Sequence, residues 1–137
     1  MKVIFVDVGN TCRSLMAKAL ARVLVGNSIH ASSAGTRPGQ RADAQSAIET
    51  LILEFKIDAS AHLPQDVHSI DLNDFDYIIA IDDDRGRREV AEKLKTLSER
   101  EIVQWRIRDP FGRGDEYRPC ADRTLFQLKR FKKRFGA

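Results

Sequence analysis

The stretch KVIFVDVGNTCRSLMAKALARVLV, residues 2–25, joins an apolar run to an amphipathic segment through one short polar loop. Residues 2–6 form a short apolar run, which is consistent with a strand buried on both faces. Residues 14–25 carry one apolar stripe at helical spacing, and Ser14 is a residue type that caps helix N-termini. A buried strand that enters a helix through a tight loop predicts the first unit of an alternating α/β fold.

The same alternation of apolar runs and amphipathic segments continues along the rest of the chain. Three further strands are predicted at residues 29–33, 77–81 and 102–107. Three further helices are predicted at residues 43–55, 84–97 and 115–135, the last with Pro119 in its first turn. This order implies a parallel sheet with helices on both faces, and open sheets of this kind bind ligands at the carboxyl ends of their strands.

The composition is typical of a globular protein. The 137 residues fit a single domain, 1–137, with 42% hydrophobic and 31% charged residues. The net charge of +3 favours anionic ligands but does not indicate nucleic acid. No apolar run approaches the ~20 residues that a membrane span needs, and the two cysteines do not make a disulfide framework. We therefore expect a cytoplasmic monomer that binds neither nucleic acid nor a membrane.

Residues 7–14, DVGNTCRS, form the loop that holds most of the expected chemistry. Gly9 and Asn10 are residue types that tolerate positive φ, and a tight loop of this kind points consecutive backbone N–H groups at an anion. The start of the following helix adds partial positive charge, and Arg13 can donate to two oxygens of a phosphate-like ion. The alternative is an ordinary turn with a solvent-facing Arg13. A Walker loop is excluded, because no Gly-Lys-Ser/Thr follows.

Residues 5–20 resemble the signature of the low-molecular-weight protein tyrosine phosphatases and of their thioredoxin-coupled arsenate reductase relatives. In that signature a strand leads to a nucleophilic Cys, five residues, Arg, Ser or Thr, and a helix. Three further segments follow in the family's order and spacing, namely SAGT at 33–36, FDYIIAID at 75–82 and DPFG at 109–112. The resemblance implies a three-layer, flavodoxin-like fold with a four-stranded parallel sheet, no cofactor, and phosphorylated tyrosine or arginine side chains of proteins as substrates.

The resemblance also implies roles for individual residues. Arg13 would bind the phosphate, Ser14 would donate a hydrogen bond to the nucleophile position, and Asp109 would protonate the leaving group. Asn10 would hold the loop in shape. The cradle for phosphate, or for sulfate in its place, would consist of Val8, Gly9, Asn10, Thr11, Cys12, Arg13 and Ser14.

The nucleophile position itself, with five residues between it and Arg13, holds Asp7 instead of Cys. The family's chemistry needs a thiolate, which is both a strong nucleophile and a good leaving group in the second step. Loss of a catalytic nucleophile costs on the order of 10⁶ in rate. We therefore expect the chain to be inactive or impaired as a thiol-based phosphatase. The carboxylate would either repel a dianionic ligand or pair with Arg13.

Two other functions stay open at this point. One is a pseudo-enzyme that binds a phosphorylated partner without turnover. The other is a Mg²⁺-dependent enzyme that forms an acyl phosphate on Asp7. No metal site is predicted, because His30, His62 and His68 lack the spacing of metal ligands. The acidic run at residues 82–84 is interpreted as a cap and dipole partner for the following helix.

Two further residues indicate which branch of the family the chain is most similar to. At position 11 this chain has Thr, as do the protein-arginine phosphatases that it resembles. Trp105, shortly before Asp109, is instead similar to the Trp that often precedes this loop in the arsenate reductases. Arsenate reduction is not expected, because the stretch 80–90 contains none of the redox cysteines that those reductases need. Cys12 corresponds to the family's second cysteine, and we interpret both Cys12 and Cys120 as small buried thiols.

Overall fold

A computed structural model describes residues 1–135 of the chain. Its sheet contains β1 (Lys2–Asp7), β2 (His30–Gly35), β3 (Tyr77–Asp82) and β4 (Ile102–Arg106). All neighbouring strands are parallel and lie in the order β2-β1-β3-β4. The helices are α1 (Arg13–Leu24), α2 (Gln45–Phe55), α3 (Glu89–Leu97) and α4 (Tyr117–Phe135).

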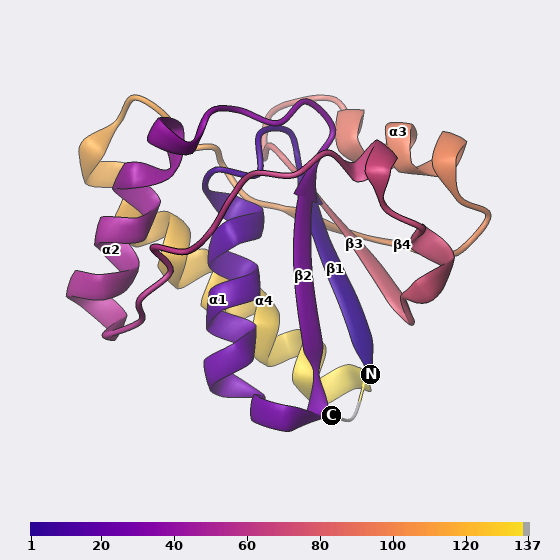
Figure 1. The fold of residues 1–137 in the computed structure, drawn as a ribbon, viewed down its shortest axis with the longest axis horizontal. Helices are drawn as coiled ribbons and strands as arrows, with labels where there is room; N and C mark the ends of the chain where they lie inside the picture. Colours follow the sequence, from indigo (N-terminus) through magenta and orange to yellow (C-terminus); the bar gives the residue numbers. More distant parts are fainter. Residues whose placement is uncertain (136–137) are drawn as a thin grey trace.

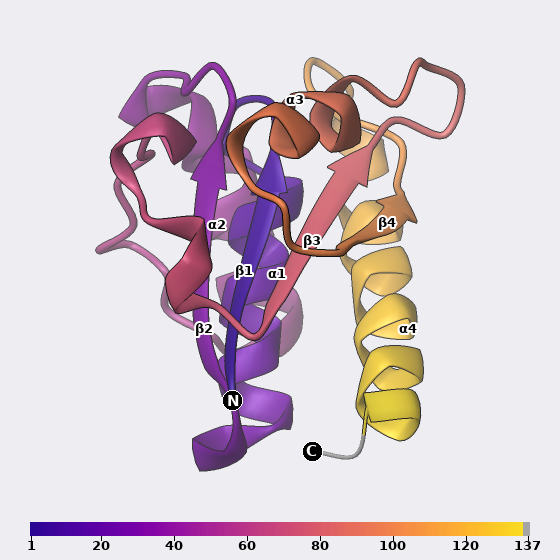
Figure 2. The same ribbon diagram turned by 90° about the vertical axis from the view of Figure 1, so that its right-hand side faces the viewer.

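Helices cover both faces of the sheet, with α1, α2 and α4 on one side and α3 on the other (Figures 1 and 2). Successive side chains of a strand point to opposite faces, so the central strand β1 supplies two cores. Val3 and Phe5 pack in the core beneath α1 and α4, whereas Ile4 and Val6 pack in the core beneath α3. The predicted flavodoxin-like, three-layer α/β fold is therefore confirmed.

Within residues 1–135, no helix combines the length and the apolar character that crossing a lipid bilayer would require. The longest helix, α4, instead carries a mixed surface, with Leu128 and Phe131 buried and charged residues outside. Pro119 is the third residue of α4 and therefore lies in its first turn, as its missing N–H requires.

The predicted start of one helix is wrong. The helix predicted from Asp84 begins at Glu89, because the Asp82 carboxylate reaches past the intervening loop. Its Oδ1 accepts a hydrogen bond from the backbone N of Val90 at 2.7 Å, and its Oδ2 accepts one from Ala91 N at 3.2 Å. Asp82 is thus the member of the acidic run that fills the predicted role of partner for the helix N-terminus.

The start of α1 also differs from the prediction. The helix begins at Arg13, and the N-cap residue before it, Cys12, makes no side-chain capping hydrogen bond. Ser14 lies inside the first turn, and its hydroxyl donates to Asp7 Oδ1 at 2.7 Å instead of capping the helix. The side chain of Ser14 is therefore committed to the loop that precedes α1.

Replacing Asp82 with Ala is expected to lower the free energy of unfolding by about 1–3 kcal/mol, since the buried amides of Val90 and Ala91 would lose their acceptor. Urea denaturation measures the effect. The matched control is Asp74→Ala, which removes the same charge from an exposed position and should stay within about 0.5 kcal/mol of the parent. Equal effects of the two substitutions would contradict the capping role.

Candidate functional site

The loop between β1 and α1 lies at the carboxyl edge of the sheet (Figure 2). Its shape depends on Asn10, which is buried and has a left-handed φ of 56°. The side-chain Nδ2 of Asn10 donates to Ser14 Oγ at 2.8 Å, and its Oδ1 accepts from Gln65 N at 3.0 Å. One side chain therefore ties the loop both to α1 and to the segment before β3.

The Asp7 carboxylate lies beneath this loop and is 2% exposed. Its Oδ1 accepts hydrogen bonds from Asn10 N at 2.7 Å and from Ser14 Oγ at 2.7 Å. Its Oδ2 accepts one hydrogen bond, from Ser14 N at 3.2 Å. The base of the loop thus already contains one negative group, supplied by the chain itself.

The Arg13 guanidinium is buried beside that carboxylate, with Nε 3.8 Å from Asp7 Oδ2 and Nη2 3.7 Å from Asp109 Oδ2. Its Nη1 donates to the carbonyl of Ile107 at 3.2 Å. Burial pushes the pKa of Arg13 down, but the charges of Asp7 and Asp109 outweigh it and raise the pKa above its usual value. Arg13 does not face bulk solvent, so the alternative of an ordinary turn with a solvent-facing arginine is wrong.

Several donors of the loop remain without an acceptor. Arg13 Nε is buried and has no hydrogen-bond partner among residues 1–135. Within residues 9–13 of the loop, only Asn10 donates a backbone hydrogen bond to another described residue, and the N–H groups of Gly9, Thr11, Cys12 and Arg13 donate none. Buried or partly buried donors normally have a partner, so this set could satisfy the oxygens of a bound anion.

Asp109 lies on the loop between β4 and α4, at the same edge of the sheet. Its side chain is 42% exposed, and the backbone N of Phe111 donates to its Oδ1 at 3.0 Å. Its own backbone N donates to Asp83 Oδ2 at 3.2 Å. The fold therefore brings Asp109, which is far away in the sequence, to Arg13 and Asp7 of the cradle loop.

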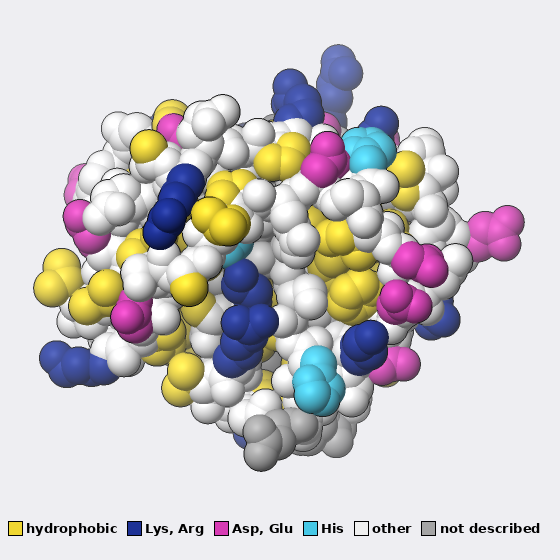
Figure 3. All heavy atoms as spheres, viewed as in Figure 1, with side chains coloured by type: hydrophobic (Ala, Val, Ile, Leu, Met, Phe, Trp, Pro, Cys, Tyr) yellow, Lys and Arg dark blue, Asp and Glu magenta, His cyan; other side chains and the backbone are white. Residues whose placement is uncertain are grey.

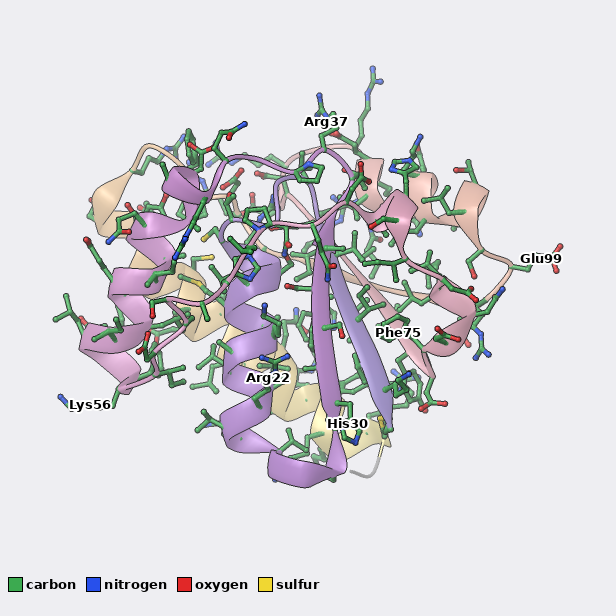
Figure 4. The ribbon with its side chains drawn as sticks, in the orientation of Figure 1. Arg22, His30, Arg37, Lys56, Phe75 and Glu99 are labelled. Atoms are coloured by element: carbon green, nitrogen blue, oxygen red, sulfur yellow. The ribbon has the colours of Figure 1, made fainter. Side chains whose placement is uncertain are left out.

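Charged side chains surround this edge. In Figures 3 and 4, Lys and Arg side chains project from the end of the molecule where the strands finish, and Arg37 points outward there. The guanidinium of Arg37 donates to Glu89 Oε1 at 2.8 Å, which links the segment after β2 to α3. The backbone N of Arg37 donates to Val8 O at 2.9 Å, so the same segment also braces the cradle loop.

His62 and Lys18 support the loop, although no local pattern in the sequence marks either residue for this role. His62 is buried, and its Nε2 donates to the carbonyl of Asn10 at 2.7 Å. Its Nδ1 lies 2.7 Å from Lys18 Nζ. Burial lowers the pKa of His62, and burial followed by the charge of Arg22 lowers the pKa of Lys18 to about 8. His62 is therefore a neutral brace of the loop.

Cys12 and Cys120 are both buried, as interpreted from the sequence. A hydrogen bond to Cys120, together with burial, raises the pKa of the Cys12 thiol well above its usual value. Cys12 thus stays protonated although it precedes Arg13. Among residues 1–135, no group of three His, Cys, Asp or Glu side chains is placed to hold a metal ion.

Gly35, the last residue of β2, touches the cradle directly. A Cβ atom at this position would lie 2.5 Å from Val8 O and 3.1 Å from Asn10 N. Gly35→Ala is therefore expected to lower the free energy of unfolding by about 1–3 kcal/mol and to weaken phosphate binding. Gly114→Ala is the control, because no atom lies within 4 Å of its added Cβ. Denaturation and phosphate titration of both variants measure the difference, and equal results would contradict the close contact.

Comparisons with known proteins agree with this geometry. The family described as low molecular weight phosphotyrosine protein phosphatase matches residues 2–135. The low molecular weight protein tyrosine phosphatase of T. tengcongensis is 25% identical, with a TM-score of 0.84 over 98% of this chain and 99% of that one. An arsenate reductase from Archaeoglobus fulgidus is 26% identical, with a TM-score of 0.77 over 94% of this chain and 97% of the other.

The YwlE arginine phosphatase of Geobacillus stearothermophilus shares the fold, at 23% identity and a TM-score of 0.76 over 98% of this chain and 92% of its own. The family match runs from β1 through α4 and so includes the cradle loop, Arg13 and Asp109. With this match over nearly its whole length, the chain belongs to the low molecular weight phosphotyrosine protein phosphatase family.

Proposed function

We propose that this chain binds the phosphoryl group of a phosphorylated protein side chain, or free phosphate, in the cradle of residues 8–14 without hydrolysing it through a thiol intermediate. The observation that carries the proposal is the buried Asp7 carboxylate, held by Asn10 and Ser14 at the position where the family resemblance implies a nucleophile. Arg13 and the loop amides, to which the family resemblance assigns phosphate binding, support the proposal by their unpaired donors.

Neither Asp7 nor Cys12 is suited to replace the missing thiolate. The hydrogen bonds that Asp7 accepts from Asn10 and Ser14 stabilise its negative charge and reduce its nucleophilicity. The Cys12 thiol is buried, and its raised pKa keeps it protonated, whereas the reactive form of cysteine is the thiolate. Turnover by the family's covalent route therefore lacks its first step.

The unpaired donors of the cradle support binding of a phosphoryl group even though the covalent thiol step is missing. Arg13 Nε and the free loop amides are positioned at a helix N-terminus, where backbone N–H groups and the helix dipole favour an anion. Thr11 is the residue type that the protein-arginine phosphatases carry at this position, and this similarity favours phosphoarginine over phosphotyrosine as the bound side chain. Arsenate reduction is not proposed, because residues 80–90 contain no cysteine.

Titration of the isotope-labelled protein with phenyl phosphate at pH 5.5, where the probe keeps its hydroxyl, followed by amide NMR, tests this proposal. We expect saturable shifts of the amide signals of Gly9, Thr11 and Cys12, since these N–H groups would gain an acceptor. Arg37→Gln is the control, because it removes an exposed arginine of the same edge and should leave these shifts in place. Absence of saturable shifts at the loop, in both the parent and the control, would overturn the proposal.

A further inference from the structure

We propose that the cradle selects oxyanions that carry a hydroxyl group, above all inorganic phosphate, and discriminates against sulfate and against the dianion of a phosphomonoester. The proposal rests on the proposed function and adds to it the chemical form of the ligand. It follows from the presence of one free acceptor among the free donors of the site.

The cradle contains several hydrogen-bond donors without an acceptor. Arg13 is 3% exposed, and its buried Nε has no partner among residues 1–135. A buried guanidinium nitrogen without an acceptor is unusual, because each such group loses its hydration on folding. With the amides of Gly9, Thr11 and Cys12, it forms a set of donors for the hydroxyl-free oxygens of an anion.

The acceptor is Asp7 Oδ2. Each oxygen of a carboxylate offers about two acceptor sites. Asp7 Oδ1 accepts two hydrogen bonds, from Asn10 N and Ser14 Oγ, whereas Oδ2 accepts only one, from Ser14 N. One acceptor site of Oδ2 is therefore free within the described part of the chain.

The free acceptor and the free donor are neighbours, since Asp7 Oδ2 lies 3.8 Å from Arg13 Nε. A ligand oxygen that accepts from Arg13 Nε therefore brings a second ligand oxygen close to Asp7. If that oxygen carries a proton, it donates to Oδ2. If it does not, two negative oxygens meet in a buried site, where their repulsion is weakly screened.

Besides Asp7 and Arg13, four ionisable side chains contact the cradle or its partners: Asp109 near Arg13, Asp83 on the Asp109 backbone, His62 on Asn10, and Lys18 on His62. Lys18, whose pKa burial lowers to about 8, loses part of its charge by pH 8, and sulfate, which has no proton to lose over this range, reports that loss separately from the ligand's own ionisation. His62, whose pKa is lowered by burial, stays neutral at neutral pH. The two aspartates beyond Asp7 add negative charge and so oppose a second charge on the ligand.

Three anions differ in whether they carry a hydroxyl group, and they therefore test the proposed selection. Inorganic phosphate keeps at least one hydroxyl at both pH 5.5 and pH 8, whereas sulfate has none at either pH. Phenyl phosphate loses its only hydroxyl near its second pKa, at about 6. The proposal therefore predicts a different pattern of affinity and pH dependence for each anion.

Isothermal titration of the whole chain with each probe at both pH values measures these patterns. Phosphate is expected to bind at both, sulfate about tenfold more weakly or worse, and phenyl phosphate about tenfold more weakly at pH 8 than at pH 5.5, since one hydrogen bond becomes a repulsion. In Asp7→Asn the charge is gone, and sulfate should gain about tenfold. Asp7→Ser, which places no new N–H beside Ser14 N, is the second variant if Asp7→Asn fails to fold.

The results of these titrations distinguish the selection for a hydroxyl group from phosphoryl binding itself. Sulfate that binds the unchanged protein as tightly as phosphate does would overturn the selection and leave phosphoryl binding intact. Sulfate that gains nothing in a folded Asp7 variant would also overturn it, because Asp7 would then not be the discriminating group. Failure of all three anions to bind the parent and both variants would overturn the proposed function itself.

Discussion

Asp7→Cys is expected to turn this protein into a phosphatase that hydrolyses aryl phosphates. The new thiol would take the place of a carboxylate that accepts from Ser14 Oγ and Asn10 N and lies beside Arg13, and all three stabilise a thiolate. Arg13, the loop amides and Asp109 are already in place, and preorganised electrostatics is usually the largest part of such catalysis. Since loss of a nucleophile costs on the order of 10⁶ in rate, we expect a gain of roughly 10³-fold or more.

Steady-state release of the phenol from an aryl phosphate measures this gain. The double variant Asp7→Cys with Asp109→Asn is the matched control, because it lacks only the proposed acid and should lose about 10²–10⁴ of the new activity. An Asp7→Cys protein that is folded, binds phosphate and still shows no hydrolysis would mean that the site has lost more than its nucleophile. The chain would then be a binding module whose geometry no longer supports the reaction.

The activated variant also tests the substrate class. If Thr11 marks the arginine-phosphatase branch, Asp7→Cys should hydrolyse phosphoarginine faster than phosphotyrosine. Equal or faster hydrolysis of phosphotyrosine would contradict that assignment and leave membership of the family untouched.

Arg13→Met is expected to have the second largest effect, on both stability and binding. The substitution leaves the Asp7 carboxylate buried without its cation, and breaking a buried ion pair in this way costs about 3–5 kcal/mol. It also removes the guanidinium that would hold the anion. Chemical denaturation should show the loss of stability, and calorimetric titration should show the loss of phosphate binding.

Two variants make this prediction specific. Arg37→Met removes an arginine whose ion pair with Glu89 is exposed, and it should cost less than about 1 kcal/mol. The double variant Arg13→Met with Asp7→Asn should recover part of the stability, because no buried charge is left unpaired. An Arg13→Met protein as stable as Arg37→Met would contradict the account of the buried pair.

The sheet and its helices could be predicted because their signals are local. The apolar runs and the helical spacing on either side of the 7–14 loop depend only on neighbouring residues, and the structure follows them within a few residues. The start of α3 could not be predicted, because it depends on the Asp82 carboxylate reaching Val90 and Ala91 across a loop.

The site was predictable only where a sequence motif marked it. Arg13 and Asp7 are identified by their spacing within the loop, and Asp109 by the Asp-Pro that resembles the family's acid loop. The brace formed by His62 on Asn10 joins residues 52 positions apart, and no local pattern reports such a contact. The raised pKa of Cys12 likewise depends on Cys120, which α4 brings alongside.

The most direct test of the account is an aryl phosphatase assay of the unchanged protein, with Mg²⁺ and with EDTA. If Asp7 is a fixed acceptor that has replaced the nucleophile, the protein binds the aryl phosphate at pH 5.5 and releases no phenol at pH 5.5 or pH 8, with Mg²⁺ or with EDTA. Hydrolysis that requires Mg²⁺, stops with EDTA and disappears in Asp7→Asn would contradict this, because Asp7 would then be the nucleophile of a metal-dependent enzyme.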